Sequence, residues 1–289
     1  MRIAILFTFA LVVIAQSAHS QLLDISDKHE LTVRFDQTFM SSDRYYDADE
    51  TIIPIRTNSI HISTVSAEYA ASKRFIMFGS FPLFVRNTIN ELRYRQSGTK
   101  VSGVELNSFG DANAGFGYRV IQTKNMYSTL FFQFGFPLGK ISGLGTDGDL
   151  QNGDGEFNQI IGFTQRLGSR VKGFFVAGNV LFNNRTEDYS NEIHYSFEGG
   201  WTNKRFGARV HYFSIESLFN NTAPVSLNGI FSNHREIRSI GCQFLLNTND
   251  RLSFSVKADV PVSGRNTLAA VAYGVGIQFR SARRIRKHL

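Results

Sequence analysis

The stretch that decides the fold is Leu252-Ser253-Phe254-Ser255-Val256-Lys257-Ala258-Asp259-Val260, near the end of the chain. Every second residue in it is apolar, and the residues between are small or charged. Because successive side chains of a β-strand point to opposite faces, this alternation predicts a strand with one apolar and one polar face. The same pattern recurs upstream and downstream, most clearly in 129–136, 193–201 and 270–279.

Segments of this kind follow one another along the whole chain after residue 28. We predict strands at 29–40, 58–71, 75–88, 112–122, 126–138, 157–168, 172–184, 192–202, 206–218, 235–247, 251–262 and 267–280. Tight polar turns alternate with long links; the turns are 72–74, 123–125, 168–170, 203–205 and 248–250, and the links are 41–57, 89–111, 139–156 and 219–234. Short turns at one end and long loops at the other are typical of transmembrane β-barrels.

The composition of the 289-residue chain supports that interpretation. It contains 27 Phe and 25 Gly but only 5 Pro, and 19% of its residues are charged, against roughly 25% in soluble domains. A helical membrane protein is excluded, because no span after the N-terminus supplies the roughly 20 apolar residues that a helix needs. A soluble sandwich would have shorter strands. We therefore predict an all-β, closed antiparallel transmembrane barrel of about twelve strands, with Phe-rich faces outward and polar, Gly-rich faces inward.

The N-terminus predicts export. Met1-Arg2 precedes an apolar run from Ile3 to Ala15 and a small-x-small end, Ala18-His19-Ser20, which is typical of a secretory signal peptide; a buried first helix is the alternative. We expect a signal peptide at 1–20, a barrel at 21–280 in the cell outer membrane, and a basic tail at 281–289. The chain's one cysteine allows no internal disulfide and no Cys-built metal site.

The positive charge lies mostly outside the predicted barrel. The formal net charge is +7, and loss of Arg2 with the signal peptide leaves 30 Lys and Arg against 24 Asp and Glu, or +6. Five of the basic residues lie in the last ten positions, 280–289. A nucleic-acid-binding protein would show a basic stripe across a folded face, and this sequence shows none, so no nucleic-acid partner is expected.

Ionisable residues on the polar faces are the candidate lumen lining. They are Arg34, Asp36, Glu68, Arg119, Arg166, His194, Glu198, Arg209, His211, Lys257 and Asp259. Both signs are present, so ion pairs inside a narrow barrel would limit the desolvation cost. Two interpretations stay open: a polar packing network that fills the barrel, and a solute path lined by these charges.

The acidic, glycine-rich stretch 143–156 invites three interpretations. Its Gly143-x-Gly145-x-x-Gly148 matches the dinucleotide fingerprint, but no helix follows, so this match is discarded. A weak calcium site could use the carboxylates of Asp147, Asp149, Asp154 and Glu156, although the spacing departs from an EF-hand loop. An exposed hairpin turn is the favoured interpretation, and neither a metal nor a cofactor is predicted.

Two His-x-Ser pairs raise an enzymatic alternative. Outer-membrane phospholipases carry such a pair on a lipid-facing strand, and this chain has His61-Ile62-Ser63 and His194-Tyr195-Ser196. Alternation puts each His and Ser on one face, as activation of a serine by histidine requires. The Asn-Gly that follows the pair in that family is missing here, so we predict that the protein is not an enzyme and name no catalytic residue.

Three short motifs resemble a known transporter family. Phe136-Pro137-Leu138-Gly139, the stretch from Asp149 to Gln159 and the stretch from Val260 to Asn266 resemble bacterial outer-membrane transporters of the phenol-degradation meta-pathway type, distant relatives of the long-chain fatty-acid channels. The likeness covers most of 110–280. It implies passage of small hydrophobic or aromatic molecules and no catalytic residues. About eight residues separate Gln21 from the first strand, so the plug of the fatty-acid channels is expected to be absent.

The sequence thus predicts a passive outer-membrane channel or transporter for small, hydrophobic or aromatic solutes. Its expected partners are outer-membrane lipid, the barrel-assembly machinery and the solute itself, and no oligomeric state is indicated. The alternative is a structural or adhesive barrel with a plugged lumen, whose links 41–57, 89–111 and 219–234 contact the outside.

Overall fold

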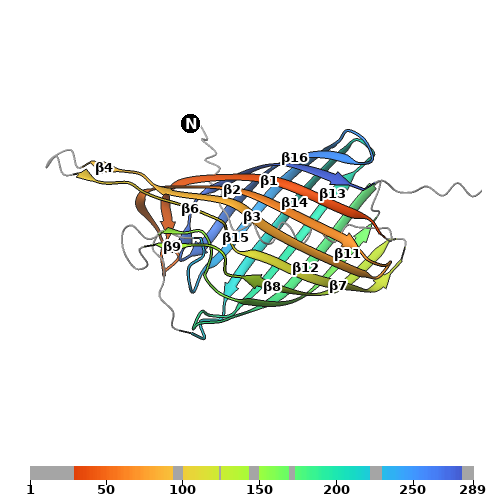
Figure 1. The fold of residues 1–289 in the computed structure, drawn as a ribbon, viewed down its shortest axis with the longest axis horizontal. Coiled ribbons are helices and arrows are strands. Elements are labelled where there is room, and N and C mark those ends of the chain that lie inside the picture. Colours follow the sequence, from red (N-terminus) through yellow and green to blue (C-terminus); the bar gives the residue numbers. More distant parts are fainter. Residues whose placement is uncertain are drawn as a thin grey trace, which may run out of the picture.

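Twelve long strands dominate the computed structural model, which describes residues 29–93, 100–123, 125–142, 150–168, 173–221 and 230–281 (Figure 1). They are β1 (Leu31–Tyr46), β2 (Ile52–Ala70), β3 (Phe75–Ile89), β7 (Ala112–Gln122), β8 (Met126–Phe136), β11 (Asn158–Gly168), β12 (Gly173–Arg185), β13 (Glu192–Thr202), β14 (Phe206–Ser217), β15 (Glu236–Asn247), β16 (Leu252–Arg265) and β18 (Val271–Arg280). The predicted signal peptide and residues 282–289 of the predicted tail lie outside the described residues. Among the described residues, no helix is long and apolar enough to cross a membrane.

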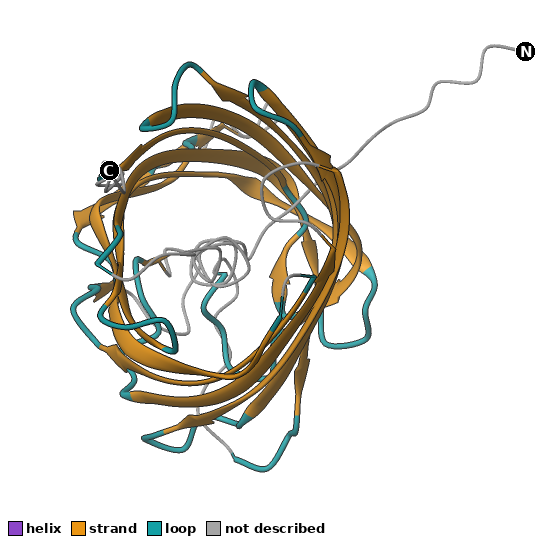
Figure 2. Ribbon diagram, turned by 90° about the vertical axis from the view of Figure 1, so that its right-hand side faces the viewer, coloured by secondary structure: helices purple, strands orange, loops and turns teal. Residues whose placement is uncertain are grey.

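The sheet closes on itself. Each long strand pairs antiparallel with its neighbours in sequence, and β1 pairs with both β2 and β18. Leu31 faces Tyr69 on one side, and Thr32 faces Arg280 on the other. Viewed along its axis, the sheet forms a ring (Figure 2). The predicted closed antiparallel barrel of about twelve strands is confirmed.

Alternation along each strand sorts side chains between the two sides of the wall. In β18, Tyr273, Val275, Ile277 and Phe279 are exposed, while Ala272, Gly274, Gly276 and Gln278 are buried. The exposed aromatic rings pack against each other across strands, as Phe75, Phe116 and Phe132 do in a stacked row. A barrel with apolar residues outside and polar residues inside is built for lipid.

The prediction of a long link at 41–57 is wrong. Strand β1 continues to Tyr46 and β2 begins at Ile52, with a bulge between Ser42 and Arg44. The intervening turn is held by the Asp47 carboxylate, which accepts hydrogen bonds from the backbone N–H groups of Asp49 and Thr51, both at 2.9 Å. The segment lacks clean alternation because of the bulge, so the sequence pattern missed this part of the hairpin.

Short strands gather at the end of the barrel opposite the tight turns, which we call the outer end. They are β4 (Leu92–Arg93), β5 (Lys100–Val101), β6 (Val104–Ser108), β9 (Ile141–Ser142), β10 (Leu150–Gln151) and β17 (Thr267–Leu268). Strand β6 continues the pairing with β3 beyond β7, and the β4–β5 hairpin extends away from the barrel at the left of Figure 1. The predicted link 89–111 therefore carries structure of its own.

Two links fold inward at the outer end. Within the described part of the predicted link 139–156, Leu150, Gln151 and Asn152 are fully buried, and the end of the next link buries Ile230 and Asn233. The prediction of an exposed turn is therefore wrong for 150–156. Polar side chains of these links bond to the barrel, as when Asn87 Nδ2 donates to the Gln151 carbonyl at 3.0 Å, and this pairing offsets the cost of burial.

The inward face is not uniformly polar. An apolar cluster lies inside the outer half of the barrel, formed by Met40, Ile60, Ile62, Val85, Phe213, Ile215, Ile230, Ile237, Leu268, Ala270 and Ala272. Phe231 packs against it beside Ile230. The prediction of a polar, Gly-rich interior therefore fails in this half, because the inserted link supplies apolar side chains that need apolar partners.

Candidate functional site

Most of the predicted lumen-lining residues are buried on the inward face. Those with at most 8% exposure are Arg34, Glu68, Arg119, Arg166, His194, Glu198, Arg209 and Asp259. Asp36, His211 and Lys257 are partly buried. Inward burial is compatible with packing and with a solute path, so the lining role of these residues stays a prediction.

Four of the predicted residues form two direct contacts, one between the neighbouring strands β13 and β14 and one between β14 and β16. Arg209 Nη1 donates to Glu198 Oε2 at 3.2 Å, and Arg209 Nε donates to Gln243 Oε1 at 2.6 Å. Two residues further along β14, His211 Nε2 lies 2.6 Å from Asp259 Oδ1 of β16. These contacts hold β13 to β16 together on the inside of the wall.

The other predicted residues find different partners. Arg34 Nε donates to Gln278 Oε1 at 2.7 Å, and the Arg166 guanidinium lies 3.8 Å from the ring centre of Phe175. Arg119 Nη1 donates to a backbone carbonyl at 3.3 Å. Asp36 and Lys257 occupy the space over Gly276 and Gly274, where a Cβ would collide with them. The inward glycines thus make room for charged side chains.

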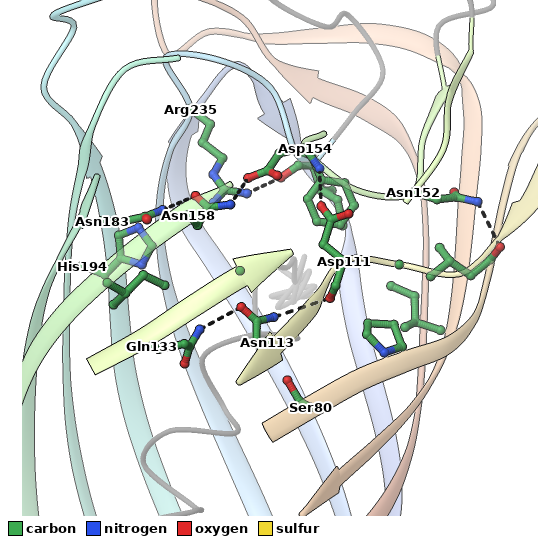
Figure 3. Close-up of a pocket in the computed structure, with 18 of the residues that line it drawn as sticks. Ser80, Asp111, Asn113, Gln133, Asn152, Asp154, Asn158, Asn183, His194 and Arg235 are labelled. Carbon is green, nitrogen blue, oxygen red and sulfur yellow. Dashed lines mark hydrogen bonds between the residues drawn. The ribbon is translucent and has the colours of Figure 1, made fainter. Parts of the chain in front are cut away.

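A cavity lies inside the barrel near the outer end (Figure 3). Its volume is about 90 Å³. One part of its wall is apolar and includes Ile62, Pro82, Val85, Ile160, Leu181, Ile230 and Phe231. The other part is polar and includes Ser80, Asp111, Asn113, Gln133, Asn152, Asp154, Asn158, Asn183, His194 and Arg235. A concave wall of both kinds is the usual setting for binding a small molecule.

A buried carboxylate organises the charges beside this cavity. Glu192 Oε1 accepts from Arg185 Nη1 and from Arg235 Nε, both at 2.9 Å, and Oε2 lies 2.7 Å from His194 Nε2. Arg235 also donates to the Ile230 carbonyl at 2.9 Å. The network therefore ties the inward-folded link to β12 and β13.

A second carboxylate fixes the link that follows β8. Asp111 Oδ1 accepts the N–H of Gly139 and its Oδ2 accepts the N–H of Asp154, both at 2.7 Å. Burial, reinforced by the neighbouring Asp154 carboxylate, raises the pKa of Asp111 to about 7. Burial likewise raises the pKa of Glu156 to about 7. One aspartate thus bonds to both ends of the predicted link 139–156.

The weak calcium prediction receives no support. Asp147 and Asp149 lie outside the described residues. Asp154 Oδ2 accepts from Asn158 Nδ2 at 3.0 Å, and Glu156 Oε2 accepts from the Thr186 hydroxyl at 3.0 Å. In the part of the chain that the structure describes, no group of three or more His, Cys, Asp or Glu could hold a metal ion.

Neither His-x-Ser pair forms a catalytic arrangement. His61 Nε2 and the Ser63 hydroxyl both contact Gln37 Oε1, at 2.6 and 3.0 Å. Because that oxygen can only accept, both groups donate to it and His61 Nε2 is not free to take the serine proton. His194 is buried against Glu192 instead.

Sequence reasoning missed the residues that matter most at the cavity. It selected ionisable residues and so passed over the amides Asn113, Gln133, Asn158 and Asn183, which occupy inward positions of strands. The alternation could have found them, since each falls on a polar face. Glu192, Arg185 and Arg235 lie at or beside strand ends, where alternation gives no signal.

Solved structures share the fold. An outer-membrane channel from Pseudomonas putida F1 is similar over 89% of this chain and 97% of its own, at 9% identity and a TM-score of 0.62. The translocator domain of the autotransporter NalP from Neisseria meningitidis matches over 94% and 100%, at 10% identity and a TM-score of 0.52. The KdgM porin, solved with disordered oligogalacturonate, matches over 87% and 99%, at 8% identity and a TM-score of 0.51.

These similarities show the fold. The chain shares the closed β-barrel fold of an outer-membrane channel and of a porin. Since the similar structures include a channel, a porin and a translocator domain, the fold leaves the cargo open. No protein-family model matches the sequence, and no curated protein matches it either.

Proposed function

We propose that this protein is a passive outer-membrane channel for small, hydrophobic or aromatic solutes, of the type found in the phenol-degradation meta-pathway transporters. The observation that carries the proposal is the cavity inside the barrel, whose wall combines apolar residues such as Ile160 and Leu181 with hydrogen-bonding side chains. Such a wall suits a mostly apolar solute with a polar group. The predicted lumen-lining charges lie along the same interior.

The test is solute flux through the purified barrel in vesicles whose outer leaflet contains lipopolysaccharide. We expect entry of small aromatic solutes at a rate well above that of empty vesicles. Ile160→Trp, which fills the cavity from β11, should reduce this flux severalfold. Ile161→Trp, on the outward face of the same strand, is the matched control and should leave flux unchanged. Equal flux in barrel-containing and empty vesicles would refute the channel.

A structural or adhesive barrel is the second candidate, favoured by one specific observation. Residues 150–156 and 230–235 fold into the outer end, where Asn152 Nδ2 donates to the carbonyls of Val85 and Leu106 at 3.0 and 3.2 Å. If these contacts close the lumen permanently, no solute passes, and the exposed hairpins are then the part of the protein that makes functional contacts outside the cell. Absence of flux together with intact cell-surface adhesion would favour this candidate.

We also propose that the protein is exported to the outer membrane and that it has no catalytic activity. Residues 1–20 act as the signal peptide, and the barrel-assembly machinery inserts the remainder into the outer membrane. The measurement is the N-terminal residue of the mature protein isolated from outer membranes, expected to be Gln21. An N-terminus at Met1 in the membrane fraction would contradict it.

A further inference from the structure

One chain of hydrogen bonds runs along the inner side of the barrel wall, from Asp154 through Asn158 to Asn183 (Figure 3). Asn158 Nδ2 donates to Asp154 Oδ2 at 3.0 Å and to the Glu156 carbonyl at 3.1 Å. A backbone carbonyl can only accept, so the amide orientation of Asn158 is fixed. Its Oδ1 therefore accepts from Asn183 Nδ2 at 2.9 Å. The buried Asn183 Oδ1, at the end of the chain, has no partner among the described residues.

A second chain of hydrogen bonds, on the neighbouring strands β7 and β8, has the same order of donors and acceptors. Asn113 Nδ2 donates to the Asp111 carbonyl at 3.5 Å, and Gln133 Nε2 donates to Asn113 Oδ1 at 2.8 Å. The first group in the chain is again a carbonyl, so every amide along it donates in the same direction. Gln133 Oε1 ends the chain, buried and unpartnered within the described ranges.

Two further side chains, His194 and Asn152, present acceptor atoms because their donor atoms are already bonded to other groups. Glu192 is ionised between two guanidinium groups, so His194 Nε2 donates to it and Nδ1 becomes an acceptor. Asn152 gives both amide hydrogens to carbonyl and hydroxyl oxygens, which leaves Oδ1 to accept. Neither His194 Nδ1 nor Asn152 Oδ1 is bonded by any residue in the described part of the chain.

These atoms surround an apolar patch in one cavity. Gln133, Asn152, Asn183 and His194 all line it, and none is more than 4% exposed. Gln133 pairs in register with Ile160, and Ile160 pairs with Asn183, so the two amides lie two strands, or about 10 Å, apart. The cavity thus offers acceptors on both sides of an aliphatic side chain, and among the described residues that line it, the unpartnered buried polar atoms are all acceptors.

We propose that this cavity is a binding site for an uncharged solute with an apolar body and at least two O–H donors, such as a small diol. The inference rests on the proposed channel function and names its solute class. A diol satisfies acceptors on both sides while its carbon skeleton packs on Ile160 and Leu181. A pure hydrocarbon leaves the acceptors unpaired, and a carboxylate brings its own lone pairs against theirs.

The first experiment measures binding without transport. Saturation-transfer NMR on the full barrel in detergent micelles compares cyclohexane-1,4-diol with its dimethyl ether and with cyclohexane-1,4-dicarboxylate. We expect the diol to bind at least about fivefold more tightly than the ether, as loss of hydrogen bonds to buried acceptors implies, and the dicarboxylate not to bind. An ether or dicarboxylate that binds as tightly as the diol would overturn the proposal.

The second experiment assigns the acceptors. Asn183→Leu and Gln133→Leu each remove one free oxygen and should weaken diol binding about five- to tenfold, with ether binding unchanged. The two variants lie on different strands, so a folding defect in one leaves the other informative. Asn179→Leu is the control, because Asn179 lies on β12 with Asn183 but outside the cavity wall. Equal diol affinity in all three variants and wild type would assign the binding elsewhere.

Binding and flux together separate this inference from the channel proposal. Flux of small solutes without preference for the diol over its ether overturns the inference and leaves the channel standing. Diol binding that depends on Asn183 and Gln133, without any flux, overturns the channel and leaves the site.

Discussion

Glu192 shows how single residues hold the interior together. Its side chain is 1% exposed, and it accepts hydrogen bonds from Arg185 and Arg235. Desolvating three charges costs several kcal/mol per ion, and the mutual attraction repays this only while all partners are present. Removing the carboxylate charge should therefore destabilise the fold, because Arg235 would lose its ion pair with Glu192 and Arg185 would keep only its ion pair with Asp154, at 3.5 Å.

We predict that Glu192→Gln lowers the unfolding free energy by about 3–5 kcal/mol, the usual cost of breaking a buried ion pair. Urea titration of the barrel in lipid vesicles measures this change. Glu105→Gln is the control, since Glu105 of β6 forms an exposed ion pair with Arg86 of β3 at 2.8 Å and the variant should be indistinguishable from wild type. A Glu192 variant as stable as the control would show that the network contributes no stability.

Asp111 gives stability a pH dependence. Its pKa rises from 3.8 to about 7 in the folded chain, chiefly by burial. Between these values the folded protein binds more protons than the unfolded one, so the unfolding free energy falls as pH rises from about 4 to about 7 and then levels off. The difference between wild type and Asp111→Asn, measured by urea titration at several pH values, should show this decline. A difference that is flat or rises over that window would contradict it.

At the scale of elements, the strands whose bounds are predicted best are those in which polar and apolar residues alternate regularly. A strand with a regular polar–apolar repeat, such as β13, begins and ends at its predicted bounds. The bulge in β1 and the inserted segment 230–235 were missed, because neither has a periodic signal. Their positions depend on partners distant in sequence, as Arg235 depends on Glu192 at 2.9 Å. The sequence alone predicts which face of each strand is apolar, but it does not predict which links fold into the barrel.

The inserted link should limit passage through the outer end. Ile230 is buried in the apolar cluster and Phe231 packs against it, and burial of such side chains stabilises by about 1.5–3 kcal/mol each. We expect the double variant Ile230→Ser, Phe231→Ser to release the link and raise single-channel conductance in planar bilayers. Leu218→Ser, on an exposed part of the preceding segment, should not. Unchanged conductance in the double variant would mean that this link does not restrict the path.

At the scale of the whole molecule, the fold reverses the polarity of a soluble protein. Phe-rich faces point outward, while Arg34, Glu68 and Asp259 are buried inside. Closure of β1 against β18 makes this possible, since a closed sheet leaves no backbone edge to lipid. The alternation predicted which residues face inward. It could not predict the cavity, because the cavity depends on links folded over the polar faces.

This reversed polarity predicts a depth-dependent cost for outward charges. Phe132 lies near the middle of β8 and Leu246 near the tight-turn end of β15, and both are exposed on the outer face. Phe132→Arg should cost about 2–4 kcal/mol of folding free energy in vesicles, and Leu246→Arg about 0–1 kcal/mol, because only the first places a charge at the bilayer midplane. Urea titration in the same vesicles measures both, with Phe132→Leu controlling for loss of the ring. Equal costs at the two positions would refute the assignment of this face to lipid.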